Sequence, residues 1–483
     1  MMTLFWLVLG LIYLASLGLI FVIILRKPQP SAALAWILSI VFLPIAGALL
    51  YLVFGSGRLM RTNRRKQRAN QQVRLNLLSQ GGEVKSQAEK ILKDLPAPLE
   101  NIATLTSRLG SFNVLEGNQV RFLNSAEAAY DEMEKAITSA EHHIHLQSYI
   151  IQPDHIGRRF QELLIKKASQ GVMVHLLYDA IGSYEMGKNK EFLAAFREAG
   201  IYPREFLPLR TFLRPWNLNL RNHRKILVVD NRIGFTGSLN IGGEFLTQTD
   251  SPDYDRWRET HLMMEGPAVT QLQWVFAEDW FFTTHIELST EAFFQPAPPC
   301  GEDLVQVIAS GPDDSRGAIH QSVLSAINEA QESVDLITPY FIPDETFLIT
   351  LEMASRKGVD IRLIVPRKAD HTFVSLATRS YYTRLLKSGV RVFEYQPGML
   401  HTKLMTVDGH FSVIGSANLD IRSFGDNFEV NVQLYGARSA GEAQRIFEGD
   451  LENSREILLP SFMNRPMRKR VAENSCRLLS PLL

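Results

Sequence analysis

Two short motifs with the same composition and spacing occur in the two halves of the chain. The first contains His223, Lys225 and Asp230 and is followed by Gly237-Ser238-Leu239-Asn240. The second contains His401, Lys403 and Asp408 and is followed by Gly415-Ser416-Ala417-Asn418. In both copies Lys follows His by two positions, Asp by seven and Gly by fourteen. Because a chance match would not be expected to recur with identical spacing, we interpret the two motifs as a functional pair.

The residue types of each motif are suited to binding an anion. An apolar run follows each His-x-Lys, at residues 226–229 and 404–407, and a strand there places the imidazole and the ammonium group on one face. Ser238, Asn240, Ser416 and Asn418 end the following strands and can add hydroxyl and amide groups to the same face. This set is rich in hydrogen-bond donors and poor in carboxylates, so we predict a phosphate-binding site.

One copy of the motif supplies a single titratable base, whereas two copies supply the two histidines that a displacement at phosphorus needs. One imidazole attacks phosphorus and the other protonates the departing alkoxide. The two lysines and two asparagines hold the non-bridging oxygens, a task that a metal ion performs elsewhere. Since no Asp, Glu and His cluster with metal-ligand spacing accompanies the motifs, we expect no metal.

A histidine nucleophile needs a partner on its second ring nitrogen, usually a carboxylate or a carbonyl group. Glu259 follows His223 by 36 residues and Glu429 follows His401 by 28, and we predict that these two glutamates orient the histidines. Asp230 and Asp408 belong to the repeated sets, and we include them with the histidines and lysines among the candidate catalytic residues. Their position at the end of a strand nevertheless favours capping of a turn over contact with substrate.

Length and composition indicate two ordinary domains and an appendage: the chain has 483 residues, of which 46% are hydrophobic and 21% charged. Lys and Arg together number 51, as do Asp and Glu, so the net charge gives no reason to expect a nucleic-acid partner. The two cysteines, Cys300 and Cys476, lack the spacing of a zinc site or a redox motif, and we expect no disulfide framework.

The N-terminal region contains two apolar runs, residues 4–25 and 32–54, each long enough to cross the roughly 30 Å hydrocarbon core of a bilayer. The link between them is too short to cross back, so we predict a transmembrane helical hairpin over residues 1–55. Seven basic residues and no acidic one follow the hairpin: Arg58, Arg61, Arg64, Arg65, Lys66, Arg68 and Arg74. By the positive-inside rule, the remainder of the chain faces the cytoplasm.

The remainder reads as a basic connector, residues 56–115, and two α/β domains, residues 116–296 and 297–483. Each domain begins with a helix, strand, helix and strand in the same order; the helices are expected at residues 125–141 and 158–169, then 318–332 and 344–357. Gly171 and Gly358 end equivalent helices. The first half has an insertion, residues 206–220, that is interpreted either as a packed surface loop or as a loop that dips into the membrane.

The doubled His-x-Lys-x4-Asp and Gly-Ser-x-Asn motifs resemble those of the phospholipase D superfamily. Four further features are similar to the bacterial cardiolipin synthases of the two-span type: the apolar N-terminal pair, the match of residues 148–151 with 338–343, the run 276–280, and the ending 477–483. The resemblance covers almost the whole chain. It implies two pseudo-symmetric phospholipase D-type α/β sandwich domains behind the hairpin.

The same resemblance implies an activity and a location. A phosphatidyl group would pass from one phosphatidylglycerol to another, giving cardiolipin and glycerol, with no cofactor. His223 would be the nucleophile and His401 the acid and base, although the sequence itself does not rank them. The enzyme would be a multi-pass protein of the bacterial inner membrane, and its oligomeric state is left open, a homo-oligomer included.

Three alternatives use the same features. A membrane-bound phospholipase D that releases phosphatidic acid would differ only in using water as the acceptor. A tethered nuclease of the superfamily is disfavoured by the neutral overall charge and by the absence of a basic stripe with interleaved aromatic residues. A non-enzymatic membrane scaffold is disfavoured because both motifs are intact.

Overall fold

The computed structural model describes residues 2–26, 30–52, 89–109, 112–208, 220–246, 257–288, 291–295, 297–313 and 317–480. The chain divides into two compact units, residues 1–62 with 209–220 and residues 63–208 with 221–483. The basic stretch 58–74 and most of the 206–220 insertion lie outside the described residues.

The described residues of the N-terminal unit include the helices α1 (Met2–Arg26), α2 (Pro30–Phe42) and α3 (Pro44–Leu50). The second apolar run, predicted as one span, is therefore divided at Leu43, whose backbone (φ −133°, ψ 71°) is not helical because a proline follows it. The hydroxyl of Ser16 in α1 donates to the carbonyl of Pro44 at 3.1 Å. Among the described residues, no helix combines the length and the apolarity needed to cross a membrane.

The larger unit is built on one 16-stranded sheet that runs through both halves of the chain. The first half contributes β1 (Leu115–Leu123), β2 (His143–Ser148), β3 (Met173–Asp179), β4 (Arg204–Phe206), β5 (Arg221–Asn222), β6 (Ile226–Val229), β7 (Ile233–Gly237) and β9 (His261–Glu265), of which β5 pairs with β19 off the main strand order. The second contributes β10 (Asp303–Ser310), β11 (Ser333–Ile337), β13 (Asp360–Pro366), β14 (Arg391–Tyr395), β16 (Leu404–Val407), β17 (Phe411–Gly415), β19 (Asn427–Tyr435) and β20 (Ser454–Glu456).

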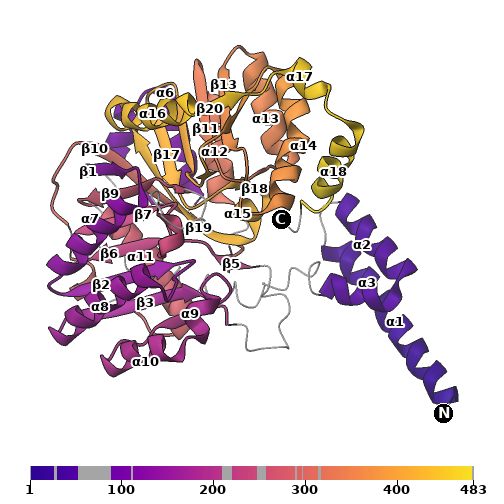
Figure 1. The fold of residues 1–483 in the computed structure, drawn as a ribbon, viewed down its shortest axis with the longest axis horizontal. Helices are drawn as coiled ribbons and strands as arrows, with labels where there is room; N and C mark the ends of the chain where they lie inside the picture. Colours follow the sequence, from indigo (N-terminus) through magenta and orange to yellow (C-terminus); the bar gives the residue numbers. More distant parts are fainter. Residues whose placement is uncertain are drawn as a thin grey trace. The chain divides into compact units, whose positions relative to one another are not determined.

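The strand order shows that the halves are repeats. It runs β20-β14-β13-β11-β16-β17-β19-β10 in the second half and continues β1-β9-β7-β6-β2-β3-β4 in the first, so each half reads outward from a central β10–β1 pair in the same order. That central pair is antiparallel, as are the strands that carry and follow the motifs, whereas β2, β3 and β4 are parallel to one another. The predicted α/β fold with two repeated halves is confirmed, and the sheet is of mixed type (Figure 1).

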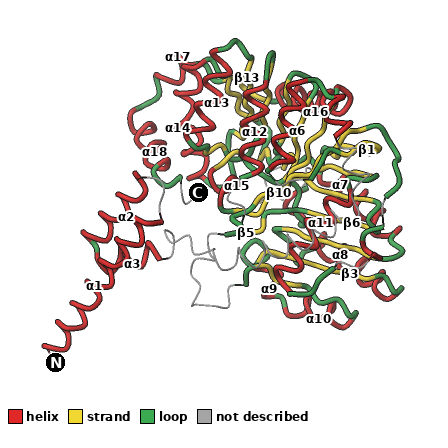
Figure 2. The backbone as a smooth tube through the Cα atoms, turned by 180° about the vertical axis from the view of Figure 1, so that it is seen from behind, coloured by secondary structure: helices red, strands yellow, loops and turns green. Residues whose placement is uncertain are grey.

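Helices cover the sheet where the sequence pattern predicts them: α7 (Ala126–Ser139), α8 (His155–Ser169), α12 (Ala318–Glu329) and α13 (Glu345–Arg356). Ser125 caps α7 by accepting from the N–H of Ala128, and Asp154 caps α8 in the same manner. Gly171 (φ +91°) and Gly358 (φ +101°) take the left-handed conformation that turns each helix back toward its next strand. The helices α11 (Val269–Thr284), α14 (Thr372–Ser388) and α16 (Ala437–Glu452) complete the layers (Figure 2).

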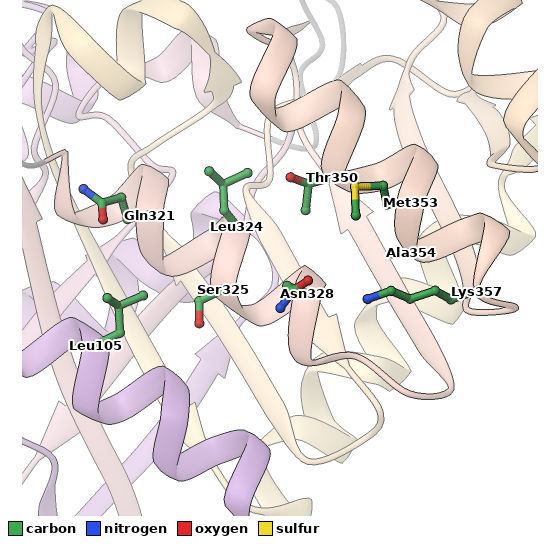
Figure 3. A pocket seen from close by; sticks show the side chains of 9 residues that line it. All are labelled: Leu105, Gln321, Leu324, Ser325, Asn328, Thr350, Met353, Ala354 and Lys357. Carbon is green, nitrogen blue, oxygen red and sulfur yellow. The ribbon is translucent and has the colours of Figure 1, made fainter.

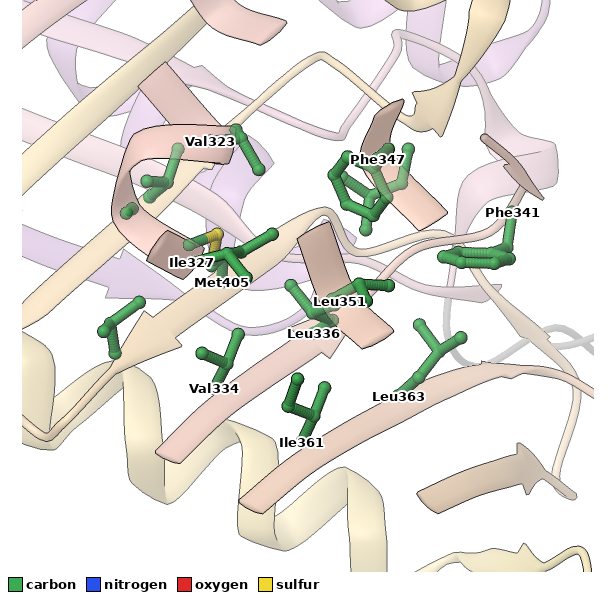
Figure 4. Close-up of a cluster of buried hydrophobic side chains, with 14 of the residues drawn as sticks. Val323, Ile327, Val334, Leu336, Phe341, Phe347, Leu351, Ile361, Leu363 and Met405 are labelled. Atoms are coloured by element: carbon green, nitrogen blue, oxygen red, sulfur yellow. The ribbon is translucent and has the colours of Figure 1, made fainter. Parts of the chain in front are cut away.

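The core of the second half shows how the repeats are stabilised. Val334 and Leu336 of β11 and Ile361 and Leu363 of β13 point from the sheet toward Leu351 of α13 (Figure 4). All five side chains are fully buried. At about 25 cal/mol per Å² of buried apolar surface, each stabilises the fold by roughly 1.5–3 kcal/mol.

The end of the predicted connector is part of this core. Helix α6 (Ala97–Arg108) buries Leu99, Ile102 and Ala103 against the second half, and Asn101 donates to Glu329 of α12 at 3.2 Å. The apolar residues at positions i, i+3 and i+4 form one face of this helix, which explains why it packs. Ordered structure of the larger unit therefore begins before residue 116.

Candidate active site

The two His-x-Lys motifs lie beside each other because each is paired with the opposite half. The short strand β5 (Arg221–Asn222), which leads into the first motif, runs parallel to the start of β19. Likewise β15 (Met399–Leu400), before the second motif, pairs with β8 (Trp257–Arg258). The N–H of His223 donates to the carbonyl of Phe428, and that of His401 to Arg258, both at 2.9 Å. The backbone of one half thus fixes the histidine of the other.

The orienting carboxylates also cross between the halves. Nδ1 of His223 lies 3.0 Å from Oε1 of Glu429, and Nδ1 of His401 lies 2.8 Å from Oε1 of Glu259. Both predicted glutamates therefore contact a histidine. Each contacts the histidine of the other half, so the pairing of each glutamate with the histidine that precedes it in its own half was wrong. Because a carboxylate only accepts, each Nδ1 carries the proton and each Nε2 keeps its lone pair.

Burial determines the charge of these pairs. It lowers the pKa of His223 to about 4, outweighing the attraction of Glu429, and it lowers the pKa of His401 as well. Burial alone would raise the pKa of Glu429, yet His223 and Lys225 hold it at about 2. At neutral pH each pair is a neutral imidazole that donates to an ionised carboxylate. Such an imidazole has the form that a nucleophile requires.

The two lysines are buried with exposed fractions of 2% and 4%. Nζ of Lys225 donates to the carbonyl of His223 at 2.8 Å, and Nζ of Lys403 donates to that of His401 at 2.7 Å. Burial and the charge of Lys403 lower the pKa of Lys225 to about 7, and burial lowers the pKa of Lys403 to about 8. Each ammonium group has three protons, so both retain donors for an anion whose charge would stabilise them.

The serines of Gly-Ser-x-Asn do not serve the role predicted for them. Ser238 donates to Glu259 and Ser416 donates to Glu429, and both side chains are fully buried. They therefore hold the orienting carboxylates and do not face a phosphate. The glycine before Ser416 is required by close packing, since a Cβ on Gly415 would lie 2.4 Å from the carbonyl oxygen of Val430.

The two asparagines of the motifs make different contacts. Oδ1 of Asn240 accepts from the N–H of Ile150 at 3.2 Å, which leaves its amide protons for another acceptor. The neighbouring Tyr149 packs edge-on against the imidazole of His223, with ring centroids 5.0 Å apart. The side chain of Asn418 hydrogen-bonds to Asp420, whose pKa burial raises to about 6.

Asp230 and Asp408, included among the catalytic residues in the sequence analysis, lie at the far end of their strands from the histidines. The carboxylate of Asp230 accepts from the backbone N–H groups of Glu141, His142 and His143 at 2.7–2.8 Å. Asp408 accepts from residues 331–333 in the same way, at 2.8–2.9 Å. These two aspartates therefore stabilise turns by accepting backbone hydrogen bonds, as their position at the end of a strand favoured. Their assignment as catalytic residues is corrected accordingly.

A buried ion pair behind His223 was not predicted from the sequence. Arg224 lies 2.7 Å from Asp279 of α11 and also donates to the carbonyls of Glu429 and Ser310, both at 3.1 Å. Asp279 in turn accepts from Asn222 at 3.1 Å. The two adjacent carboxylates Glu278 and Asp279 in the otherwise apolar segment 274–281 were the available signal, because a buried charge requires a partner.

A hollow of about 440 Å³ lies between α6, α12 and α13, and its lining includes Leu105, Met353 and Lys357 (Figure 3). None of its lining residues belongs to the His, Lys and Glu set, so we do not place the chemistry there. Within the described part of the chain, no group of three or more His, Cys, Asp or Glu side chains could hold a metal ion.

Two imidazoles held by carboxylates and two buried ammonium groups, on an α/β sheet with two repeated halves, are suited to phosphoryl transfer of the phospholipase D class. Comparison with known protein families supports this assignment. The family model "Cardiolipin synthase, PLD-like domain" matches residues 133–280 and 323–451, and the model "Phospholipase D-nuclease N-terminal" matches residues 14–56.

Relatives match over nearly the full chain. The cardiolipin synthase of Geobacillus sp. (strain WCH70) is 37% identical over 98% of this chain and 94% of its own, and cardiolipin synthase 1 of Bacillus anthracis is 35% identical over 96% and 92%. The chain belongs to the cardiolipin synthases of the phospholipase D superfamily. It is an enzyme of the phosphatidyltransferase type and is membrane-associated.

Among solved structures, a phosphatidylserine synthase of Haemophilus influenzae Rd KW20 has the same fold, with a TM-score of 0.58 and 13% identity. The match covers 78% of this chain and all of that one.

We expect Asp230→Ala and Asp408→Ala to act on stability and not on chemistry. Each leaves three backbone N–H groups without their acceptor, which should cost about 1–3 kcal/mol in the free energy of unfolding. Denaturant unfolding measures this loss, and Asp131→Ala on the exposed side of α7 is the control. Turnover per folded molecule should stay within about threefold. A hundredfold loss of turnover at unchanged stability would place the carboxylates in the reaction.

The crossed pairing predicts which histidine responds to each glutamate. Glu429→Gln removes the negative charge that raises the pKa of His223, so that pKa should fall further while the signals of His401 stay in place; Glu259→Gln should do the reverse. Nitrogen-15 NMR of the labelled protein in detergent measures the pKa values of both histidines, and Glu452→Gln, which changes an exposed glutamate, is the control. Turnover should fall about 100-fold in either variant. A response of His401 to Glu429→Gln would contradict the crossed geometry.

Proposed function

We propose that this enzyme makes cardiolipin by transferring a phosphatidyl group from one phosphatidylglycerol to a second, with release of glycerol. The observation that carries the proposal is the pair of crossed His–Glu contacts beside Lys225 and Lys403, because it offers two imidazoles to one phosphate. The names of the relatives, which match over nearly the whole chain, favour the same reaction.

In the first step, Nε2 of His223 attacks phosphorus and the bond from phosphorus to the glycerol oxygen breaks. His401 gives its Nε2 proton to that oxygen, so glycerol leaves neutral and a phosphatidyl-histidine remains. His401 must be protonated for this step, whereas burial keeps it neutral in the free site. The negative charge of the bound phosphodiester raises the pKa of the imidazole, so substrate itself prepares the acid.

In the second step, His401 removes the proton from a hydroxyl of the second phosphatidylglycerol. That oxygen attacks phosphorus, the bond to Nε2 of His223 breaks, and His401 is again protonated. Lys225, Lys403 and the amide groups of Asn240 and Asn418 bind the non-bridging oxygens through both steps. No redox step occurs, and the two displacements balance without a further reactant.

We also infer that residues 116–296 and 297–483 are the two repeated domains, and that residues 56–115 connect them to the N-terminal unit. The mirrored strand order supports this division. Helix α6 is an exception to this division, because it lies in the connector before the first domain but packs against the second.

Purified protein in phosphatidylglycerol vesicles with a chelator should produce cardiolipin and glycerol together. His223→Ala and His401→Ala should each lose at least about 10³-fold in turnover, because each removes a group that forms or breaks a bond. Mass spectrometry of the lipids and an enzymatic assay of glycerol measure both products. His410→Ala, which changes an exposed histidine after the second motif, is the control. Phosphatidic acid as the main product would identify a hydrolase.

We propose that residues 1–55 form a transmembrane hairpin whose two ends face the cytoplasm at the bacterial inner membrane. The apolar runs 4–25 and 32–54 and the basic stretch 58–74 support it. A cysteine placed within 28–31, with Cys300→Ser as the background, should react with an impermeant thiol reagent in intact cells. Reaction only after permeabilisation would reverse the orientation.

A further inference from the structure

The C-terminal helix α18 (Met467–Arg477) is fixed to the second half along one side. Its Glu473 is fully buried and pairs with Arg465 at 2.7 Å and with Arg379 of α14 at 3.4 Å. Just beyond the helix, the hydroxyl of Ser480 lies 3.2 Å from that of Tyr381. Since Cys476 is buried on the same side, the orientation of the helix is well defined.

The opposite side of α18 carries an exposed apolar row. Met467, Val471 and Leu478 are 70%, 54% and 79% exposed. Positions i, i+4 and i+11 fall on one line of a helix, directly opposite the side that contains Glu473 and Cys476.

Three exposed cations flank this row, Arg468 on one side and Arg470 and Arg477 on the other. The only acidic residue of the helix is Glu473, which faces inward and is paired. The outer side of α18 therefore combines apolar side chains with a local excess of positive charge, although the whole chain has a formal net charge of +0.

This surface is connected to the active site through a short series of contacts. Tyr381, which contacts Ser480, packs edge-on against Phe341 with ring centroids 6.2 Å apart. Phe341 begins β12 (Phe341–Ile342), which pairs with β18 (Leu419–Asp420), the strand that follows Asn418.

We propose that the outer side of α18 docks on the surface of an anionic phospholipid bilayer. Met467, Val471 and Leu478 enter the boundary between headgroups and acyl chains, while the flanking cations contact lipid phosphates. The positive charge of α18 is the reason for choosing an anionic bilayer as the partner. The partner must present many negative groups next to an apolar region, and the surface of an anionic bilayer does so. The contact would hold the site beside a membrane that contains its lipid substrates. It goes beyond the proposed reaction and does not depend on which acceptor the enzyme uses.

The first experiment locates α18 relative to the bilayer in the full-length protein. An environment-sensitive fluorophore is attached at Val471→Cys in a Cys300→Ser background, and at Tyr202→Cys as the matched control, since Tyr202 is 57% exposed in the first half. In vesicles that contain phosphatidylglycerol, spin-labelled lipid should quench the probe at 471 and not the probe at 202. Vesicles of phosphatidylcholine alone should give at most a fifth of that quenching. Equal aqueous accessibility at both positions would overturn the proposal, and so would equal quenching in the neutral vesicles.

The second experiment tests the cations. Reversal of all three, Arg468→Glu/Arg470→Glu/Arg477→Glu, should abolish quenching at 471 and raise the KM for phosphatidylglycerol about tenfold, with kcat within twofold. The control reverses three exposed cations of α8 and α10 (Lys190–Glu198), Lys166→Glu/Lys190→Glu/Arg197→Glu, and should change neither quantity. Equal effects of the two triple variants would contradict docking by this surface.

If the triple variant does not fold, the role of the cations can be tested by varying the salt concentration with the labelled protein that retains them. Quenching at 471 should fall at least fivefold between 0.05 and 1 M salt, because screening weakens the attraction to lipid phosphates. Quenching that does not change with salt would overturn the role of the charges. The quenching measurements need no turnover, so failure of the proposed reaction would leave their outcome unaffected.

Discussion

The active site depends on the two hydrogen-bonded pairs that cross between the halves, His223 with Glu429 and His401 with Glu259. Neither half alone contains a histidine together with its carboxylate. The continuous sheet makes this exchange possible, because β1 and β10 join the two halves. The neighbouring strands carry the glutamates: Glu259 lies just before β9, and Glu429 lies within β19. Because the geometry of each imidazole is fixed by the opposite half, the two repeats must fold together to form one site.

The cost of this arrangement is the burial of several charged groups. A buried charge is tolerated when it is paired, and the Arg224–Asp279 pair meets that condition. The two lysines meet it less well: each donates to the carbonyl of its own histidine, and their pKa values fall to about 7 and 8. An anion placed between them compensates their charge. The free site is therefore less stable than its occupied form, which is a property expected of a binding site for phosphate.

Much of the architecture was predictable because it is local or repeated. Spacing identified both motifs, and the glycines after the helices located equivalent turns in the two halves. The crossed pairing was not predictable, because 206 residues separate His223 from Glu429 and no periodic pattern connects them. The role of the serines was missed for a related reason. A hydroxyl group can bind a phosphate or a carboxylate equally well, and only the fold shows that Glu259 and Glu429 are its acceptors.

The helix α6 gives a further example. Its apolar face at Leu99, Ile102 and Ala103 is visible in the sequence, but the sequence does not show which half it covers. The sequence analysis assigned this stretch to the connector and predicted no helix there. The packing partner of the helix lies more than 200 positions away in the sequence. The split of the second apolar run at Leu43 is different, because Pro44 was already a sufficient local reason for it.

The differences between the halves are as informative as the repeat. The same His–Glu, Ser–Glu and Lys–carbonyl hydrogen bonds occur in both copies, whereas Arg224 of the first motif is replaced by Thr402 in the second. Arg224 makes an ion pair with Asp279, while Thr402 shares a neutral hydroxyl contact of 3.0 Å with Thr260. A reaction of two opposed displacements needs two similar histidines, but one must form a bond to phosphorus while the other moves a proton. A symmetric set in unequal surroundings meets both requirements, because the shared groups bind the phosphate and the unequal ones give each imidazole its own electrostatic field.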